Sequence, residues 1–345
     1  MTEVWRSLAE VPADFGPTVV TLGNFDGVHR GHQAVLATLV ADARAAGRRS
    51  VAVTFDPHPQ AVHRPESPPT LITGIEDRVE RLAATGLDAV VIIRYTLEFA
   101  HQTPEEFVRS CFVDGLRAAA VVIGHDTTFG WGNVGHADTM RELGAQLGFE
   151  VEVVEWAGIA NGSDRRWSST WVRELLEAGD VAGAASILGR PHRVRGEIVA
   201  GDALGREIGF PTANLDVYAG MIPAHGVYAG WVRVLEVGSS ADAAALAGRV
   251  LPAAVSLGVN STVGGTELRV EAHLIGLAGP NLEGPDGAGL GDAGPDLYGA
   301  RVALDFAARR RNMQKFGSIQ ELTAALAEDV EWCREVLGQG PPPPR

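Results

Sequence analysis

The sequence predicts two domains of different class: a doubly wound parallel α/β domain, then an antiparallel β-barrel or sandwich domain that ends in a helix. In the first half, apolar β-branched runs alternate with helical patterns, as in parallel sheets covered on both faces. Past residue 188, glycine clusters recur about every ten residues between short strand-like runs, which is typical of antiparallel domains. The 345 residues also exceed what one ordinary core serves.

The predicted strands of the first domain are short apolar runs: Thr18–Leu22, Ser50–Phe55, Ala89–Ile93 and Ala119–Gly124. The segments between them have helical spacing and are predicted as the helices Gly31–Ala46, Asp77–Thr85 and Pro104–Leu116. The third helix has strong start signals, because Thr103 can cap it and Glu106 completes a capping box. Strand and helix in alternation favour a parallel sheet.

In the second half, Gly226–Leu235 and Glu267–Ile275 are the clearest predicted strands, and Ile319–Leu337 is a predicted helix with Ser318 as N-cap. The change from alternating apolar and helical segments to glycine-separated strands places the domain boundary near Leu188–Pro191. This gives domains of residues 1–188 and 189–338 and a disordered tail, 339–345. Residues 276–296 hold seven glycines and three prolines without periodicity. We expect a flexible insertion there, with a functional lid as the alternative.

Charge and composition exclude several classes of function. The net charge of −14 argues against duplex DNA or an anionic membrane, so neither a nucleic acid nor a membrane is an expected partner. No apolar run approaches a membrane span, and the N-terminus lacks the pattern of a signal peptide. The two cysteines, Cys111 and Cys333, exclude a disulfide scaffold and a cysteine-built zinc site. We expect a cytoplasmic protein, with its oligomeric state left open.

A glycine-rich motif, GNFDGVHRGH, spans residues 23–32 between the first predicted strand and helix. Such a turn presents backbone N–H groups and a helix N-terminus to a phosphate. His29 and His32 lie where the helix begins, so both imidazoles can reach that phosphate and stabilise developing charge. The alternative is that both are surface cap residues. The other candidate ligand-binding residues of the turn are Gly23, Asn24, Phe25 and Asp26.

Two further segments favour a polyphosphate ligand. His58, in TFDPHP, follows the second predicted strand at the edge where open α/β sheets bind ligands, although a plain turn explains it equally well. RWSSTWVR, residues 166–173, places Ser169 and Thr170 at a helix start beside Arg166, which suits a di- or triphosphate or, alternatively, an ordinary cap. The sequence offers no Ser-His-Asp nucleophile. The pattern therefore favours direct nucleotidyl transfer by positioning and charge stabilisation.

These motifs resemble those of a known family. HxGH with SSTxxR downstream resembles the HxGH nucleotidyltransferase superfamily, whose domain is Rossmann-like. The fuller set, with TPEEFV at residues 103–108, resembles the adenylyltransferase module of prokaryotic bifunctional riboflavin kinase/FAD synthetases. In the second half, GREIGFPTANL at 205–215 and PAHGVYA at 223–229 resemble the riboflavin kinase β-barrel of that family.

The resemblance implies roles for individual residues. Thr212 and Asn214 of PTAN would hold Mg²⁺ and the ATP phosphates, whereas without the family PTAN is a turn with an Asx cap. Glu271 would be the general base that takes the proton from the 5′-hydroxyl of riboflavin. The remaining implied nucleotide- or flavin-binding residues are Gly205, Gly209, Asp126 and Arg311.

The implied function is phosphorylation of riboflavin to FMN with Mg-ATP, then adenylylation of FMN with a second ATP to FAD and pyrophosphate. Riboflavin, FMN, FAD and ATP are thus the expected partners. Two segments depart from the family pattern at flavin contacts: DTTFG at 126–130 and VNSTVGG at 259–265. They keep alternatives open: a diverged paralogue that acts on a flavin analogue or another alcohol, an enzyme with one remaining activity, or a non-catalytic flavin-binding protein.

Overall fold

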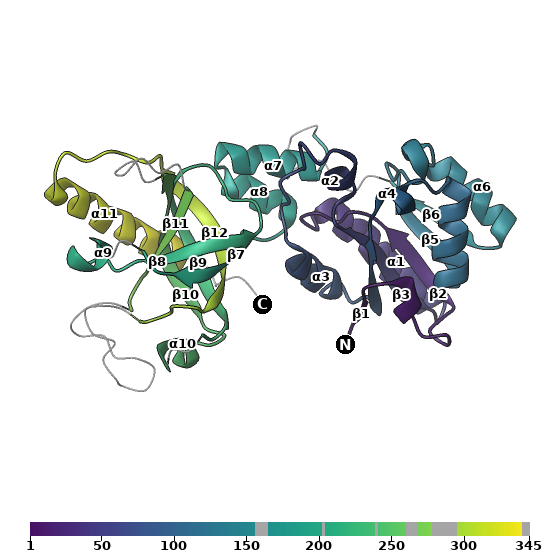
Figure 1. Cartoon of the computed structure of the whole chain (residues 1–345), viewed down its shortest axis with the longest axis horizontal. Helices are drawn as coiled ribbons and strands as arrows, with labels where there is room; N and C mark the ends of the chain where they lie inside the picture. The colour runs from purple at the N-terminus through teal and green to yellow at the C-terminus, as the bar shows by residue number, and fades with distance from the viewer. Residues whose placement is uncertain (156–164, 202–203, 239–240, 260–267, 278–294, 340–345) are drawn as a thin grey trace. The chain divides into compact units, whose positions relative to one another are not determined.

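The computed structural model describes residues 1–155, 165–201, 204–238, 241–259, 268–277 and 295–339. The chain divides into two compact units, Met1–Ser169 and Thr170–Arg345 (Figure 1). The first unit contains a parallel sheet and the second a closed antiparallel barrel. The predicted fold classes are therefore confirmed, with a barrel rather than a sandwich in the second half.

The parallel sheet has the strand order β1-β4-β3-β2-β5-β6. Its strands are β1 (Glu3–Trp5), β2 (Thr18–Leu22), β3 (Arg49–Asp56), β4 (Ala89–Arg94), β5 (Ala118–Gly124) and β6 (Glu150–Val154). The two edge strands, β1 and β6, were not predicted from the sequence. β1 is short, and β6 alternates glutamate with valine instead of forming an apolar run. Strand order reverses at β2, so the segments that follow β2, β3 and β5 border the crevice where open α/β sheets bind ligands.

Helices cover both faces of this sheet. They are α1 (Arg30–Ala45), α2 (Pro59–His63), α3 (Ile75–Ala83), α4 (Leu97–Ala100), α5 (Pro104–Phe107) and α6 (Ala137–Leu147). Successive strand residues point to opposite layers: Val51 and Val53 pack with Phe107 on one face, whereas Ala52 packs with Leu36 on the other. The sheet is therefore doubly wound, as predicted.

The predicted helix Pro104–Leu116 is only partly α-helical. It begins as expected, with Thr103 and Glu106 forming the capping box. From Val108 to Gly115 it continues as a π-helix, in which the Leu116 amide donates to the Cys111 carbonyl at 3.1 Å. The apolar periodicity located this segment correctly but could not distinguish the two helix types.

The barrel of the second unit has the strand order β10-β11-β8-β7-β12-β9. Its strands are β7 (His192–Val199), β8 (Ala213–Ala219), β9 (Gly226–Glu236), β10 (Val250–Val259), β11 (Leu268–Leu274) and β12 (Arg301–Arg311). The helices of this unit are α7 (Ser169–Ala178), α8 (Val181–Leu188), α9 (Leu204–Glu207), α10 (Ala241–Ala245) and α11 (Ile319–Gly338). Ser318 caps α11 as predicted and accepts a hydrogen bond from the Glu321 amide at 3.2 Å.

Alternation along the barrel strands separates a packed interior from an outer face. Val255 and Leu257 of β10 and Ala272 of β11 are buried in the interior, whereas the residues between them lie on the outer face. α11 covers part of that outer face, where Val330 and Cys333 pack against the barrel (Figure 1). The barrel core is therefore filled, and a ligand site is left to its outer face.

Some sequence predictions fall outside the described residues. Residues 278–294 of the expected insertion at 276–296 are not among the described residues. The same holds for residues 260–265 of the departing segment 259–265 and for the expected disordered tail from residue 340 on. The compact units divide after Ser169, so α7 and α8 group with the barrel, and the boundary near Leu188–Pro191 stays a prediction. Within the described ranges, no helix is long and apolar enough to cross a membrane.

Candidate active sites

The turn from β2 into α1 has an unusual backbone. Phe25, Gly27 and Val28 all have positive φ angles, of 48°, 82° and 41°. For Phe25 and Val28 this conformation is strained, and such strain is found where a loop serves a function. The turn is held at its start by the Gly23 amide, which donates to the Val53 carbonyl of β3 at 3.1 Å. The surrounding structure thus fixes the GNFDG segment in one conformation.

The side chains of Asp26 and Phe25 are buried and hold this turn against the rest of the domain. The Asp26 carboxylate is buried and accepts hydrogen bonds from the backbone amides of Ile72 and Thr73, both at 3.1 Å. The Phe25 ring is buried in the core beneath α1. Both side chains therefore shape the turn, and direct contact between them and a nucleotide stays a prediction. Asn24 is exposed at the top of the same turn.

His29 and His58 both cap helices through Nδ1. His29 Nδ1 accepts from the His32 amide at 3.4 Å at the start of α1, and His58 Nδ1 accepts from the Gln60 amide at 3.2 Å at the start of α2. A neutral imidazole that accepts at Nδ1 carries its proton on Nε2. The sequence left a surface cap as the alternative for His29 and a plain turn as the alternative for His58. Because each cap bond uses only Nδ1, it does not by itself exclude a ligand role for either imidazole.

His32 stacks on His29, with ring centroids 3.6 Å apart and planes inclined by 21°. Burial lowers the pKa of His32 well below its ordinary value of 6.5, and the neighbouring His29 and Arg78 lower it further. His32 is therefore neutral at physiological pH. Its Nδ1 is buried and has no hydrogen-bond partner among the described residues.

Ser169, the last residue of the first unit, lies against this turn. The Ser169 hydroxyl donates to the Asp26 carbonyl at 2.8 Å, which brings the SST and GNFDG motifs together. Thr170 follows in the first turn of α7 and is exposed. Partial burial raises the pKa of Asp126, while the charges of His125 and Arg166 act in the opposite direction, so Arg166 lies near Asp126. The segments predicted to bind phosphate thus converge at the carboxyl end of the sheet.

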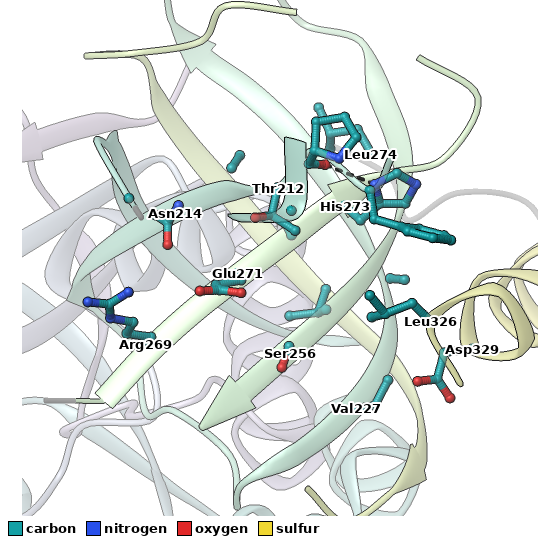
Figure 2. A pocket seen from close by; sticks show the side chains of 18 of the residues that line it. Thr212, Asn214, Val227, Ser256, Arg269, Glu271, His273, Leu274, Leu326 and Asp329 are labelled. Atoms are coloured by element: carbon teal, nitrogen blue, oxygen red, sulfur yellow. Dashed lines mark hydrogen bonds between the residues drawn. The ribbon is translucent and has the colours of Figure 1, made fainter. Parts of the chain in front are cut away.

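The second site is a cavity of about 570 Å³ on the outer face of the barrel (Figure 2). Glu271 of β11 pairs with Asn214 of β8 on one side and with Ser256 of β10 on the other. All three line the cavity, together with Thr212 and Arg269. Their side chains lie in the same part of the pocket in Figure 2. Strand register, not sequence proximity, therefore places the proposed base beside the PTAN residues.

Gly205 and Gly209, just before the PTAN motif, allow the chain to turn tightly beside the cavity. A Cβ at Gly205 would collide with the Phe210 carbonyl oxygen, and Gly209 has a φ of 84° that disfavours other residues. The Gly205 carbonyl accepts from the Phe210 amide at 2.7 Å, which closes the turn before PTAN. Gly205 lines the cavity, whereas Gly209 shapes the turn.

His273 ties the PTAN segment to β11. It follows Glu271 by two residues on the same strand, and its Nδ1 lies 2.9 Å from the Pro211 carbonyl oxygen, to which it donates. Burial lowers the pKa of His273, which the hydrogen bond to Pro211 partly opposes. Pro211 immediately precedes Thr212, so this bond ties the backbone of the PTAN segment to the strand that carries Glu271.

Arg311 lines the far side of the cavity and pairs with Asp329 of α11. Its Nη2 and Nε lie 2.6 Å and 3.1 Å from the two Asp329 carboxylate oxygens. Asp329 is buried at the cavity wall. The pair orients the guanidinium of Arg311 and joins α11 to the end of β12.

Several site residues were not found from the sequence. Ser256, Arg269 and Asp329 lie in no contiguous motif, and only the register of the barrel and the docking of α11 bring them to Glu271 and Arg311. The period-two alternation of the predicted strand 267–275 places Arg269 on the face of Glu271, and that signal alone could have found one of them.

The fold and the sites define a class of protein: a doubly wound α/β unit with a glycine-rich turn at the carboxyl end of its sheet, joined to a closed antiparallel barrel with a cavity on its outer face. The comparisons name the family. Residues 11–170 match the FAD synthetase family and residues 188–337 the riboflavin kinase family. The chain belongs to the bifunctional riboflavin kinase/FMN adenylyltransferase family, which confirms the resemblance seen in its sequence.

Relatives match nearly the whole chain. The bifunctional riboflavin kinase/FMN adenylyltransferase of Escherichia coli strain K12 is 33% identical over 333 residues, 96% of this chain and 96% of that protein. Its counterpart in Bacillus subtilis strain 168 is 32% identical over 317 residues, 91% of this chain and 90% of that one. A crystal structure from Streptococcus pneumoniae, described as a macrolide-efflux protein, has a TM-score of 0.78 at 28% identity and covers 96% of this chain and 98% of that one.

Proposed function

We propose that the barrel phosphorylates riboflavin to FMN and that the α/β domain joins FMN to the AMP of a second ATP, which yields FAD and pyrophosphate. The observation that carries this proposal is the cross-strand row of Ser256, Glu271 and Asn214 in a cavity of about 570 Å³. A carboxylate there faces hydroxyl and amide groups in a pocket large enough for a small organic ligand.

In the kinase step, the 5′-hydroxyl oxygen of riboflavin bonds to the γ-phosphorus of ATP while its proton passes to the Glu271 carboxylate. The bond between the γ-phosphorus and the bridging oxygen breaks, and ADP leaves. Asn214, directly across from Glu271, and Thr212 would hold the phosphates next to the base. Arg311, oriented by Asp329, would help to order the flavin.

The residues present fit a Mg²⁺ ion. Thr212 and Asn214 offer a hydroxyl and an amide oxygen, which are hard, neutral donors that suit an ion bound largely through phosphate oxygens and water. Among the described residues, no cluster of three His, Cys, Asp or Glu side chains forms a cage that would compete for the metal. When bound, Mg²⁺ neutralises phosphate charge.

In the adenylyl step, a phosphate oxygen of FMN bonds to the α-phosphorus of ATP, and the bond to the β-phosphate oxygen breaks to release pyrophosphate. FMN phosphate is already an anion, so this step needs no general base. Nε2–H of His29 and His58 would donate to the polyphosphate, with Asn24 and His32 beside them. Arg166, Ser169 and Thr170 would hold the pyrophosphate side. Asp126 lies near Arg166, at the segment expected to meet FMN.

Two reactions test both halves separately. Purified protein is given riboflavin with Mg-ATP in one reaction and FMN with Mg-ATP in the other, and chromatography identifies FMN and FAD. We expect FMN and FAD in the first and FAD with pyrophosphate in the second. FMN without FAD in both would leave a kinase only, and a strong preference for another flavin in a panel of analogues would favour the diverged paralogue. We also place the enzyme in the cytoplasm, since Cys111 and Cys333 are buried and unpaired.

A further inference from the structure

Arg78 is a buried cation behind the adenylyltransferase site that no sequence motif singled out. It lies on α3 with 1% of its surface exposed. Its Nη1 donates to the Phe55 carbonyl of β3 at 2.9 Å. Its Nε and Nη2 are also buried and have no hydrogen-bond partner among the described residues. A buried guanidinium with one hydrogen bond is costly, so a merely structural role explains it poorly.

The groups around Arg78 belong to the nucleotide site. Its charge acts on His32 of the HxGH motif, and the carboxylates of Asp26 and Asp56 counter it. Asp26 itself accepts from the amides of Ile72 and Thr73, just before α3 begins, so one carboxylate links the phosphate-binding turn to the helix that carries Arg78. Burial lowers the pKa of the Arg78 guanidinium, but from an ordinary value of 12.5 it stays charged at neutral pH.

Resting on the proposed function, we infer that Arg78 is a positioning residue of the adenylyltransferase. It supplies a fixed positive charge beneath the GNFDG turn and the two histidines, and the polyphosphate of ATP bound above them offsets the cost of burying that charge. The guanidinium does not touch the nucleotide, because its nitrogens lie out of reach of solvent. It acts through the field at the turn and through the β3 carbonyl that it holds.

This role predicts a trade-off between stability and ATP use. Arg78→Met replaces the buried charge with an unbranched apolar side chain that is shorter than that of arginine. We expect the KM for ATP in FAD formation from supplied FMN to rise about tenfold or more. Without ATP, the Arg78→Met variant should keep or gain thermal stability, because the costly buried charge has been removed. Arg78→Lys retains a charge and should recover most of the lost ATP affinity. FMN formation from riboflavin should stay at the wild-type rate in both variants.

The experiment measures the KM for ATP and kcat of FAD formation, and hydrogen exchange of β2 and β3 peptides with and without ATP. A structural role predicts the reverse result: Arg78→Met exchanges faster without ATP and keeps the wild-type KM for ATP, which would overturn the inference. If Arg78→Met does not fold, Arg78→Gln serves, since it removes the charge but keeps a polar amide in the buried position, and a wild-type KM for ATP there would equally overturn it. Failure of the wild-type protein to form FAD would instead reject the proposed function itself.

Discussion

In the α/β domain the proposed phosphate-binding groups come from loops and helix starts that follow parallel strands, whereas in the barrel they come from directly paired positions on neighbouring strands and from the PTAN turn before β8. The first site uses N–H donors at helix starts, with His29 and His58 fixed by their cap bonds. The second uses oxygen ligands beside a carboxylate, Glu271. The chemistry of the acceptor explains the difference. An alcohol must lose a proton in order to attack, so the kinase needs a base, whereas the phosphate of FMN attacks as an anion.

The strongest test of this contrast is removal of the carboxylate. In Glu271→Gln, FMN formation should fall about 10³-fold, because no group remains to accept the hydroxyl proton. FAD formation from supplied FMN should be unchanged. Glu236→Gln is a matched control, since Glu236 is an exposed carboxylate at the end of β9 that pairs with Arg301. An equal loss of both activities in Glu271→Gln would mean a folding defect, and retained FMN formation would exclude Glu271 as the base.

The converse change removes a donor from the α/β site. In His29→Leu, FAD formation from FMN should fall about 10²-fold, the loss typical of one donor to developing charge. FMN formation from riboflavin should be unaffected. His136→Leu is the control, because His136 also precedes a helix, α6, but makes no cap hydrogen bond. If the His29 and His136 variants behaved alike, the His29 imidazole would be a cap and nothing more.

The comparison also shows why one site was easier to predict. GNFDGVHRGH, TFDPHP and SST are contiguous motifs at strand ends and helix starts, so local pattern suffices to locate them, and Ser169 indeed contacts the Asp26 carbonyl. The barrel site depends on register, which sets Ser256 opposite Glu271, and on the docking of α11, which brings Asp329 to Arg311. These contacts are separated by tens of residues, and no local signal encodes them. The burial of Arg78 was not predicted for another reason: a single arginine in an amphipathic helix is usually exposed.

A smaller effect should follow from loosening the PTAN segment. In His273→Leu the bond to the Pro211 carbonyl is lost, so Thr212 is less well held relative to Glu271. We expect the KM for ATP in FMN formation to rise roughly tenfold, with a smaller change in kcat. Asn can donate from nearly the same position as Nδ1, so His273→Asn should restore most of the loss. No restoration by asparagine would indicate that the imidazole acts by packing against Phe210 instead.

The smallest expected effect is a pH dependence of the stability of the α/β domain, which arises from His32. Its pKa in the folded domain lies below the ordinary 6.5, because burial above all, and then the neighbouring His29 and Arg78, disfavour the imidazolium. Below about pH 6.5 the His32 side chain is therefore protonated in the unfolded chain but stays neutral in the folded domain. The stability contributed by the neutral imidazole is complete above that pH and falls as the pH drops toward the pKa of the folded state. Hydrogen exchange of β2 and β3 peptides should quicken between about pH 7 and 5.5, after correction for intrinsic rates. His32→Asn cannot take up this proton, so its exchange should depend less on pH. Equal pH dependence in the variant and the wild type would show that His32 is not the group responsible.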